Sequence, residues 1–385
     1  MKWSNPGHEY DRMSFLFTNR NINYYIWGEG ILGNTFFENF KGKIHIVGFI
    51  DSDARKQGKR ADGVTVYKPD EIHLSENEVI IIATGWIDEV EGWMRKHNLK
   101  RDRDYFRMED FSNNFYWYNY GKVCFDVIGF ICNTVCTLKC KNCVGLIPYS
   151  VNKKNLTFNE MVSSIDCVFA VVDWINVLAL SGGDAIVNKD ISRFMEYLGE
   201  RYLNQKLQRI ELYTNGVVLP DDELLKVMEK YNVIVRVSDY GDQTKGLQKI
   251  TEIENILRAH RIQFERVTFD RWVDIGYPQE TNGIFEKYGG KGVEAHCKRC
   301  APVICSAVYL DKLFYCSPAA YAYASGLFEG DEDDWFDLLS DAKNKKSELR
   351  EFYLGYSKKG FPSYCMKCNG LFNNNPKSVI PGEQL

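Results

Sequence analysis

From residue 123 onward, short apolar runs alternate with longer amphipathic stretches, and this alternation constrains the fold more than any other feature of the sequence. The apolar runs have the length of strands and cover residues 123–130, 177–180, 209–213, 233–237 and 263–269. The amphipathic stretches have helical spacing and cover residues 158–173, 191–203, 221–231 and 251–260. This order predicts an α/β fold built from βα units around a parallel sheet, with any chemistry at the carboxyl ends of the strands.

The length and charge of the chain argue against several classes of protein. With 385 residues it is too long for one ordinary domain. Its net charge is −4, whereas a nucleic-acid-binding protein usually shows a basic excess. The first residues lack the apolar core of a secretory signal, and no apolar run approaches the ~18 residues of a membrane span. We therefore expect a cytoplasmic protein with no nucleic-acid or membrane partner.

Residues 1–110 are predicted to form a Rossmann-like nucleotide-binding domain. An apolar strand runs into a G-x-G-x-x-G turn, and the next strand ends in an acidic residue. The residues of this pattern are Gly28, Gly30, Gly33 and Asp51. The glycines would let the backbone approach a pyrophosphate at a helix N-terminus, and Asp51 would accept hydrogen bonds from ribose hydroxyls. The expected ligand is a nucleotide, NAD or a nucleotide sugar; the alternative is a scaffold of this fold that binds no nucleotide.

The aromatic and polar stretch 111–122 is interpreted as a linker whose aromatic side chains pack between domains. The barrel domain is then expected over residues 123–290. A small cysteine-rich extension is expected over residues 291–385.

The chain contains twelve cysteines, and most of them lie in groups. In a reducing compartment, grouped cysteines indicate metal or redox chemistry rather than disulfides. Cys136, Cys140 and Cys143 have the spacing C-x3-C-x2-C directly after the first strand of the alternating region. Three thiolates can hold three irons of a [4Fe–4S] cluster and leave the fourth iron open. The alternative is a structural zinc site in which Cys132 supplies the fourth thiolate.

Polar and glycine motifs after the next strands extend this pattern. They are Gly182-Gly183-Asp184, Thr214-Asn215-Gly216 and Ser238. With the cysteine triad, they resemble the radical S-adenosylmethionine (SAM) superfamily over about residues 123–275, whose fold is a partial (βα)6 barrel of TIM type. The resemblance implies that the open iron chelates SAM and that reduction yields a 5′-deoxyadenosyl radical, which abstracts hydrogen from a substrate. It assigns contacts with SAM to Gly182, Gly183, Asp184, Thr214, Asn215 and Ser238.

Two positions depart from the pattern of that family. Asp184 stands where the family usually has Glu, and its carboxylate reaches ~1.5 Å less far. Its contact with the SAM amino group is therefore expected to be direct or through water. Asn142 stands beside the last cysteine of the triad, where an aromatic residue is commoner, which weakens stacking on adenine and leaves ligation intact.

A second group of cysteines lies near the other end of the chain. Residues 306–316 read as a hairpin whose open end would bring Cys305 close to Cys316, and Cys365 and Cys368 form a C-x2-C pair. This arrangement resembles the SPASM and Twitch extensions, which bind auxiliary [4Fe–4S] clusters. Six cysteines suffice for one such cluster and not for two. The implied ligands are Cys316, Cys365, Cys368 and either Cys300 or Cys305, and a zinc site is the alternative.

The substrate is less constrained than the cofactor. Tyr240 follows the fourth strand and is a candidate donor of a proton or a hydrogen atom. The resemblance implies an oxidoreductase or epimerase that takes electrons from an external donor such as flavodoxin or ferredoxin. The first domain resembles modules that bind nucleotide sugars, so we hypothesise a sugar-nucleotide or other sugar-derived substrate. The alternatives are peptide or protein modification and a non-catalytic iron–sulfur or zinc scaffold.

Overall fold

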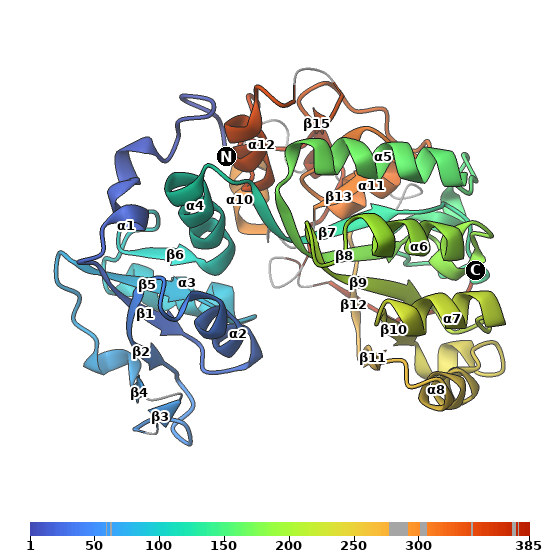
Figure 1. Ribbon diagram of the computed structural model, residues 1–385, viewed down its shortest axis with the longest axis horizontal. Coiled ribbons are helices and arrows are strands. Elements are labelled where there is room, and N and C mark those ends of the chain that lie inside the picture. Colours follow the sequence, from blue (N-terminus) through green and yellow to red (C-terminus); the bar gives the residue numbers. More distant parts are fainter. Residues whose placement is uncertain are drawn as a thin grey trace. The chain divides into compact units, whose positions relative to one another are not determined.

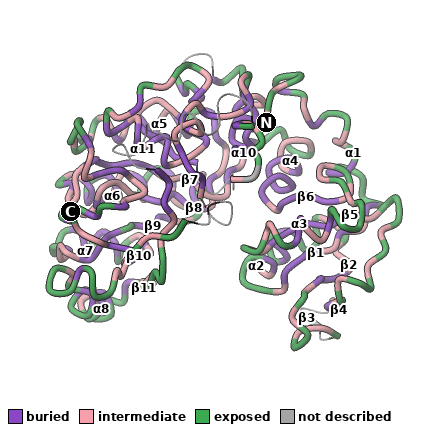
Figure 2. Tube along the Cα trace, turned by 180° about the vertical axis from the view of Figure 1, so that it is seen from behind, coloured by how far each residue is buried: buried purple, intermediate pink, exposed green. Residues whose placement is uncertain are grey.

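The computed structural model describes residues 1–58, 60–61, 64–276, 292–300, 306–339, 342–371, 375 and 377–385. These residues form two compact units, of which one is His8–Lys122 and the other combines Met1–Gly7 with Val123–Leu385. In each unit the buried residues concentrate along the strands of a sheet (Figure 2). The described part of the chain contains no helix that is long and apolar enough to cross a membrane.

The His8–Lys122 unit is built on a sheet whose strand order is β3-β4-β2-β1-β5-β6 (Figure 1). The strands are β1 Asn23–Trp27, β2 His45–Ile50, β3 Arg60–Ala61, β4 Val64–Tyr67, β5 Glu78–Ile82 and β6 Tyr105–Arg107. The helices are α1 Phe15–Thr18, α2 Ile31–Phe40, α3 Ile87–Lys96 and α4 Met108–Tyr120. Apart from β3, neighbouring strands pair in parallel. The parallel strands follow the order 3-2-1-4-5 of doubly wound nucleotide-binding sheets, with the switch point between β1 and β5.

The stretch 111–122, interpreted from the sequence as a linker, is mostly helix and belongs to this unit. Phe111 and Phe115 lie one turn apart in α4, are buried, and pack on Phe40 of α2. The side chain of Asn114 donates to the backbone oxygen of Asp110 within the helix, so a residue typical of loops is accommodated inside α4. Gly121 then ends the helix in a left-handed conformation. The interpretation was wrong because it gave more weight to composition than to the i, i+4 spacing of the phenylalanines.

The second unit contains an eight-stranded sheet with the order β11-β10-β9-β8-β7-β13-β14-β15. The strands are β7 Cys124–Ile131, β8 Trp174–Ser181, β9 Leu207–Thr214, β10 Ile234–Asp239, β11 Phe264–Thr268, β13 Ala307–Tyr309, β14 Lys312–Phe314 and β15 Trp335–Asp337. A separate pair is formed by β12 Trp272–Val273 and β16 Ser378–Val379. The helices are α5 Phe158–Val171, α6 Ile191–Arg201, α7 Asp222–Lys230, α8 Ile250–Ala259, α10 Val293–Cys300, α11 Ser317–Ala324 and α12 Lys346–Tyr353.

Strands β7 to β11 pair in parallel in chain order, as expected for a partial barrel. The described residues contain these five strands of the expected six βα units. Helices α5 to α8 cover one face of the sheet (Figure 1). Local signals set their starts: Thr157 and Glu160 form a capping box at α5, and the Asp221 carboxylate accepts from the Leu224 N–H at α7.

The described residues of the expected cysteine-rich extension, over residues 291–385, belong to the same compact unit as the barrel. The predicted hairpin is present as β13 and β14, and β13 pairs in parallel with β7. This pairing extends the barrel sheet with the hairpin.

A buried carboxyl inside the barrel sheet leads to a first prediction. Asp126 of β7 accepts from Asn176 Nδ2 of β8 at 2.8 Å, whereas its Oδ2 is buried and has no hydrogen-bond partner among the described residues. Burial raises the pKa of Asp126 to about 6. The folded state therefore holds this proton more tightly than the unfolded state does. Its contribution to stability falls as pH rises from the ordinary carboxyl pKa through about 6.

At pH values above about 6, the change Asp126→Asn is expected to raise the free energy of unfolding by about 2–3 kcal/mol, since each pKa unit corresponds to about 1.4 kcal/mol. At pH values below the ordinary carboxyl pKa, the gain should vanish. Urea unfolding across the pH range measures both, with the exposed Asp242→Asn as the control. Equal pH profiles for Asp126→Asn and the wild type would contradict the prediction.

Candidate functional site

The predicted site residues of the barrel come together at the carboxyl ends of adjacent parallel strands. Gly182 and Gly183, after β8, lie directly against the loop that follows β7 and carries the cysteines. The Gly183 N–H donates to Asn133 Oδ1 at 2.9 Å, and the Asp184 N–H donates to the Val135 backbone oxygen at 2.9 Å. A Cβ on Gly183 would lie 2.2 Å from that same oxygen. The glycines are therefore required here because any side chain would displace the cysteine loop.

Asp184 is buried at the centre of this arrangement and is 2% exposed. Its Oδ2 accepts from Thr214 Oγ1 at 3.2 Å and from the Asn215 N–H at 3.4 Å. Burial raises the pKa of Asp184 to about 7, although these hydrogen bonds oppose the shift. In the structure Asp184 thus joins the ends of β8 and β9. A carboxylate accepts up to about four hydrogen bonds, so acceptor capacity for a further donor remains.

The triad thiols receive N–H donors from two different segments. Asn215 Nδ2 donates to Cys136 Sγ at 3.3 Å, and Gln384 Nε2 donates to Cys140 Sγ at 3.2 Å. Burial raises the pKa of Cys136, Cys140 and Cys143 to about 11 each. Metal ligation must therefore displace protons from these thiols, and such N–H donors are suited to the thiolates that result.

The described residues contain no group of three His, Cys, Asp or Glu side chains arranged to hold a single metal ion. In a [4Fe–4S] cluster each thiolate binds a different iron, so the ligands do not converge on one point. Cys132, the fourth thiolate of the zinc alternative, is fully buried and its thiol donates to the Phe130 backbone oxygen at 3.7 Å. The donor set of the triad and its N–H partners therefore fit a cluster of the cubane type.

Ser238 and Tyr240 complete the predicted site at the end of β10. The Ser238 backbone oxygen accepts from Gln248 Nε2, and the same amide donates to the Asn215 backbone oxygen. Gln248, which the sequence interpretation missed, thereby ties the ends of β9 and β10 together. The ring of Tyr240 meets Trp272 edge to face at 5.1 Å between centroids.

Tyr321 of α11 is another residue that the sequence interpretation missed. Its hydroxyl donates to Ser181 Oγ at 2.9 Å, at the end of β8, and its ring lies beside Gly145 of the cysteine loop. Burial raises the pKa of Tyr321, and the nearby cysteines raise it further. The long sequence separation from the barrel motifs gave no local signal for this contact.

The downstream cysteines that the structure describes also gather in one place. They are Cys297, Cys300, Cys316, Cys365 and Cys368. The thiols of Cys297 and Cys365 share a hydrogen bond, which raises the pKa of Cys365. Burial and the nearby Cys316 and Cys368 raise this pKa further. Cys300 Sγ accepts from the Leu371 N–H at 3.1 Å, and Cys368 Sγ accepts from the Gly370 N–H at 3.2 Å.

Cys297 was not among the predicted ligands, and its C-x2-C spacing with Cys300 was the signal that could have found it. Helix α10 carries both cysteines and packs against the segment of Cys365. Cys305, one of the two candidates for the fourth ligand, lies outside the described residues. The structure therefore adds Cys297 to the candidate ligands of an auxiliary cluster.

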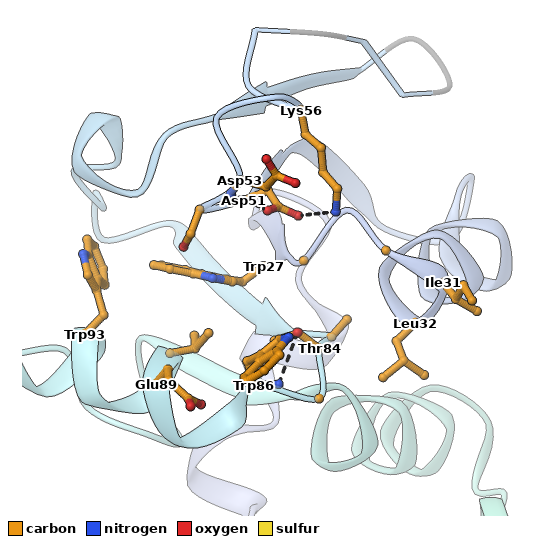
Figure 3. Close-up of a pocket in the computed structure, with 16 residues that line it drawn as sticks. Trp27, Ile31, Leu32, Asp51, Asp53, Lys56, Thr84, Trp86, Glu89 and Trp93 are labelled. Carbon is orange, nitrogen blue, oxygen red and sulfur yellow. Dashed lines mark hydrogen bonds and ion pairs between the residues drawn. The ribbon is translucent and has the colours of Figure 1, made fainter. Parts of the chain in front are cut away.

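The His8–Lys122 unit has a cavity of about 630 Å³ at the switch point of its sheet (Figure 3). Gly28 and Gly30 line it from the turn after β1, and Thr84 and Trp86 line it from the turn after β5. Trp86 is 69% exposed. Two further tryptophans, Trp27 and Trp93, have their ring centroids 4.8 Å apart. The cavity lies where doubly wound folds bind their ligands.

The predicted glycines of this cavity serve different purposes. Gly28 has a φ of +115°, and a Cβ on it would lie 2.7 Å from the Ala83 backbone oxygen. A Cβ on Gly33 would lie 1.7 Å from the Gly28 backbone oxygen, so Gly33 allows α2 to pack on the turn and does not line the cavity. A Cβ on Gly30 would meet nothing within 4 Å. Of the three, Gly30 borders open space at the start of α2.

Asp51 is already engaged within the protein. Its Oδ2 accepts from the Glu29 N–H at 2.9 Å, and its Oδ1 accepts from the Asp53 N–H at 2.8 Å. The same Oδ2 accepts from Lys56 Nζ at 3.0 Å (Figure 3). Burial raises the pKa of Asp51, but these hydrogen bonds outweigh it and lower the pKa overall. Asp51 lines the cavity with Lys56 beside it, so any ribose would meet a carboxylate that is already paired.

Residues 20–103 match a known protein family. The family is described as C2185-like, N-terminal. The match covers the sheet and the cavity of the His8–Lys122 unit up to the start of β6, and less than half of the chain. No curated protein matches the sequence.

Solved structures resemble the fold at low sequence identity. BtrN in complex with AdoMet and 2-DOIA is 12% identical with a TM-score of 0.43, covering 65% of this chain and 94% of BtrN. Native anSMEcpe with bound AdoMet and a Cp18Cys peptide is 12% identical with a TM-score of 0.41, covering 68% and 93%. Streptococcus suis SuiB bound to S-adenosylmethionine is 11% identical with a TM-score of 0.30, covering 61% and 45%. Because these likenesses are weak, the function proposed below rests on the residues of this chain.

Proposed function

We propose that this chain is a radical SAM enzyme whose first cluster is held by Cys136, Cys140 and Cys143. The observation that carries the proposal is the convergence of these thiols with Gly183, Asp184 and Asn215 at the ends of three adjacent parallel strands. When bound, such a cluster supplies the electron that cleaves SAM to methionine and a 5′-deoxyadenosyl radical.

The residues of the chain have separate parts in this proposal. Asn215 and Gln384 donate to ligand sulfurs, which stabilises the thiolate form. Gly182 and Gly183 keep the cysteine loop against the end of β8. Asp184 keeps its carboxylate beside Thr214 and Asn215, where it can accept a hydrogen bond from the SAM ammonium group. A bound ammonium would favour the ionised carboxylate and lower the pKa of Asp184.

Anaerobic reconstitution with iron, sulfide, SAM and dithionite tests the proposal. The expected product is 5′-deoxyadenosine, measured by chromatography. A reconstituted protein that binds iron and forms no 5′-deoxyadenosine would overturn the radical SAM assignment. A protein that binds zinc at the triad and no iron would favour the structural alternative.

A second, auxiliary [4Fe–4S] cluster on the downstream cysteines is part of the proposal. The wild type is then expected to hold about eight irons per chain. Cys365→Ser and Cys297→Ser should each reduce the count to about four, because both thiols lie in the same buried group. Iron analysis measures this, with the single cysteine change Cys167→Ser in α5 as the control. A count near four in the wild type would remove the auxiliary cluster.

The substrate is proposed to be a sugar nucleotide or another sugar-derived molecule, and the net reaction an oxidation or an epimerisation. In strand β9 the side chains of Ile210 and Leu212 are buried on one face of the sheet. The polar side chains of Glu211 and Tyr213 alternate with them and lie on the other face. There Tyr213 is 38% exposed and its hydroxyl donates to Glu211, which also accepts from Arg236 Nε at 3.0 Å. A polar face of this kind suits a hydroxylated substrate.

The cavity of the His8–Lys122 unit is proposed to bind a nucleotide, NAD or a nucleotide sugar, with phosphate at the start of α2. Gly30→Asp places a carboxylate there without meeting protein atoms within 4 Å of its Cβ. We expect it to weaken binding of NAD or a UDP-sugar at least about tenfold. The new carboxylate would occupy the phosphate position at the helix N-terminus and would repel the phosphate. Calorimetric titration measures the affinity, with Gly92→Asp of α3 as a charge-matched control. If no nucleotide binds the wild type while a peptide does, the substrate proposal fails.

A further inference from the structure

The last described segment of the chain, residues 378–385, lies against the loop of the cysteine triad. Its strand β16 pairs with β12, where Val379 faces Trp272. Gly382 then approaches Tyr240 so closely that a Cβ on Gly382 would lie 2.5 Å from the Tyr240 Cβ. Pro381 and Gly382 are buried. The segment is therefore packed into the end of the barrel and does not lie free on the surface.

Backbone hydrogen bonds join the same segment to the triad loop on both sides of Cys140. The Lys141 N–H donates to the Glu383 backbone oxygen at 2.7 Å, and the Leu385 N–H donates to the Lys139 backbone oxygen at 2.9 Å. Cys140 and Gln384 thus face each other in an antiparallel bridge. Two ladder bonds fix the register, so the Gln384 side chain is placed beside Cys140 by the backbone and not by its own rotamer alone.

The orientation of the Gln384 amide follows from its neighbours. Its Oε1 accepts from the Lys139 N–H at 2.8 Å, and only an oxygen can accept there. The Nε2 therefore faces the other way, where it donates to Cys140 Sγ at 3.2 Å and to the Gly382 backbone oxygen at 2.6 Å. The sulfur thus receives an N–H donor whose direction is set by a backbone contact one residue away.

We propose that Gln384 is a positioning residue for the triad cluster, and that its N–H···S hydrogen bond raises the reduction potential of that cluster. The inference rests on the proposed function. An N–H donor stabilises the extra negative charge that a one-electron reduction places on the cluster and its sulfurs, and hydrogen bonds to sulfur are among the terms that set cluster potentials. The electron comes from an external reductant, dithionite in the experiment below, and no bond is formed or broken by Gln384.

Two variants separate the N–H···S contact from the fold of the segment. Gln384→Glu retains the oxygen that accepts from the Lys139 N–H and replaces the N–H donor with a carboxylate oxygen. Gln384→Leu removes both polar contacts at similar size. Gln205→Leu, at an exposed position after α6, is the matched control.

The first measurement is an anaerobic redox titration of the reconstituted protein with dithionite, followed by electron paramagnetic resonance of the SAM-responsive cluster. At the potential where the wild type is half reduced, the reduced-to-oxidised ratio should fall roughly three- to tenfold in Gln384→Leu; tenfold corresponds to about 59 mV for one electron. It should fall at least as far in Gln384→Glu, because a negative charge then faces the sulfur. If both variants have the midpoint reduction potential of the wild type, the proposal is overturned. An equal shift of this potential in Gln205→Leu would also overturn it.

A second measurement does not depend on cluster binding. In the metal-free protein, Cys140 is 7% exposed beneath the segment. Alkylation of Cys140, followed by mass spectrometry, should speed up at least about threefold in Gln384→Leu, with Cys124 unchanged as the internal control. An unchanged rate at Cys140 would show that the contact does not exist in solution and would overturn the proposal. If the wild type bound no iron at all, the proposed function would fail, while this alkylation result would still report on the contact.

Discussion

Serine at any one of Cys136, Cys140 or Cys143 is expected to reduce formation of 5′-deoxyadenosine to the level of a reaction without protein. Each thiolate is proposed to hold one iron, so removing one leaves two protein ligands for the cluster. A serine hydroxyl is a harder and much less acidic ligand than a thiol, and it does not replace the thiolate. The measurement is chromatography of 5′-deoxyadenosine after anaerobic incubation with SAM and dithionite.

The control for this prediction is Cys167→Ser, because Cys167 lies in α5 outside both cysteine groups. It should retain wild-type product formation. The buried Cys132 gives a second comparison: under the zinc alternative Cys132→Ser would release metal, whereas under the cluster proposal it should leave the iron at the triad in place. Full product formation by a triad variant would refute the ligand assignment.

Alanine at Gly183 is expected to lower the rate of 5′-deoxyadenosine formation at least about 100-fold without removing any ligand or polar group. The new Cβ would lie 2.2 Å from the Val135 backbone oxygen and 2.9 Å from the Cys136 backbone nitrogen. Neither backbone atom can move without shifting the first cysteine of the triad. Displacements of about 1 Å at a reacting centre cost on the order of 100-fold in rate. Overpacking of this kind also destabilises a protein by about 1–3 kcal/mol.

Two measurements distinguish loss of geometry from loss of fold. Thermal unfolding of the metal-free protein reports stability, and product formation at a temperature well below the transition reports the site. Gly92→Ala in α3 is the control, since its Cβ would come no closer than 3.7 Å to another group. If Gly183→Ala cleaves SAM at the wild-type rate, the close packing of the glycine pair on the cysteine loop is not needed for the reaction.

Local sequence pattern was sufficient for most elements of the barrel. The run 209–213 became β9 Leu207–Thr214, and the amphipathic stretch 191–203 became α6 Ile191–Arg201. These elements could be predicted because hydrophobic periodicity is a property of neighbouring residues. The stretch 111–122 was misinterpreted as a linker because its composition was given more weight than the i, i+4 spacing of Phe111 and Phe115, whose rings pack on α2.

The amino-acid sequence by itself determined the alternating α/β order, the C-x3-C-x2-C spacing and the glycine motifs after successive strands. Parallel strands place their carboxyl ends at one edge, so motifs that follow those strands must meet. Only the tertiary structure decided which distant side chains meet them. Tyr321 and Gln384 reach their partners across long stretches of chain. Such contacts depend on strand register and on the packing of α11 and the 378–385 segment, which no local pattern encodes.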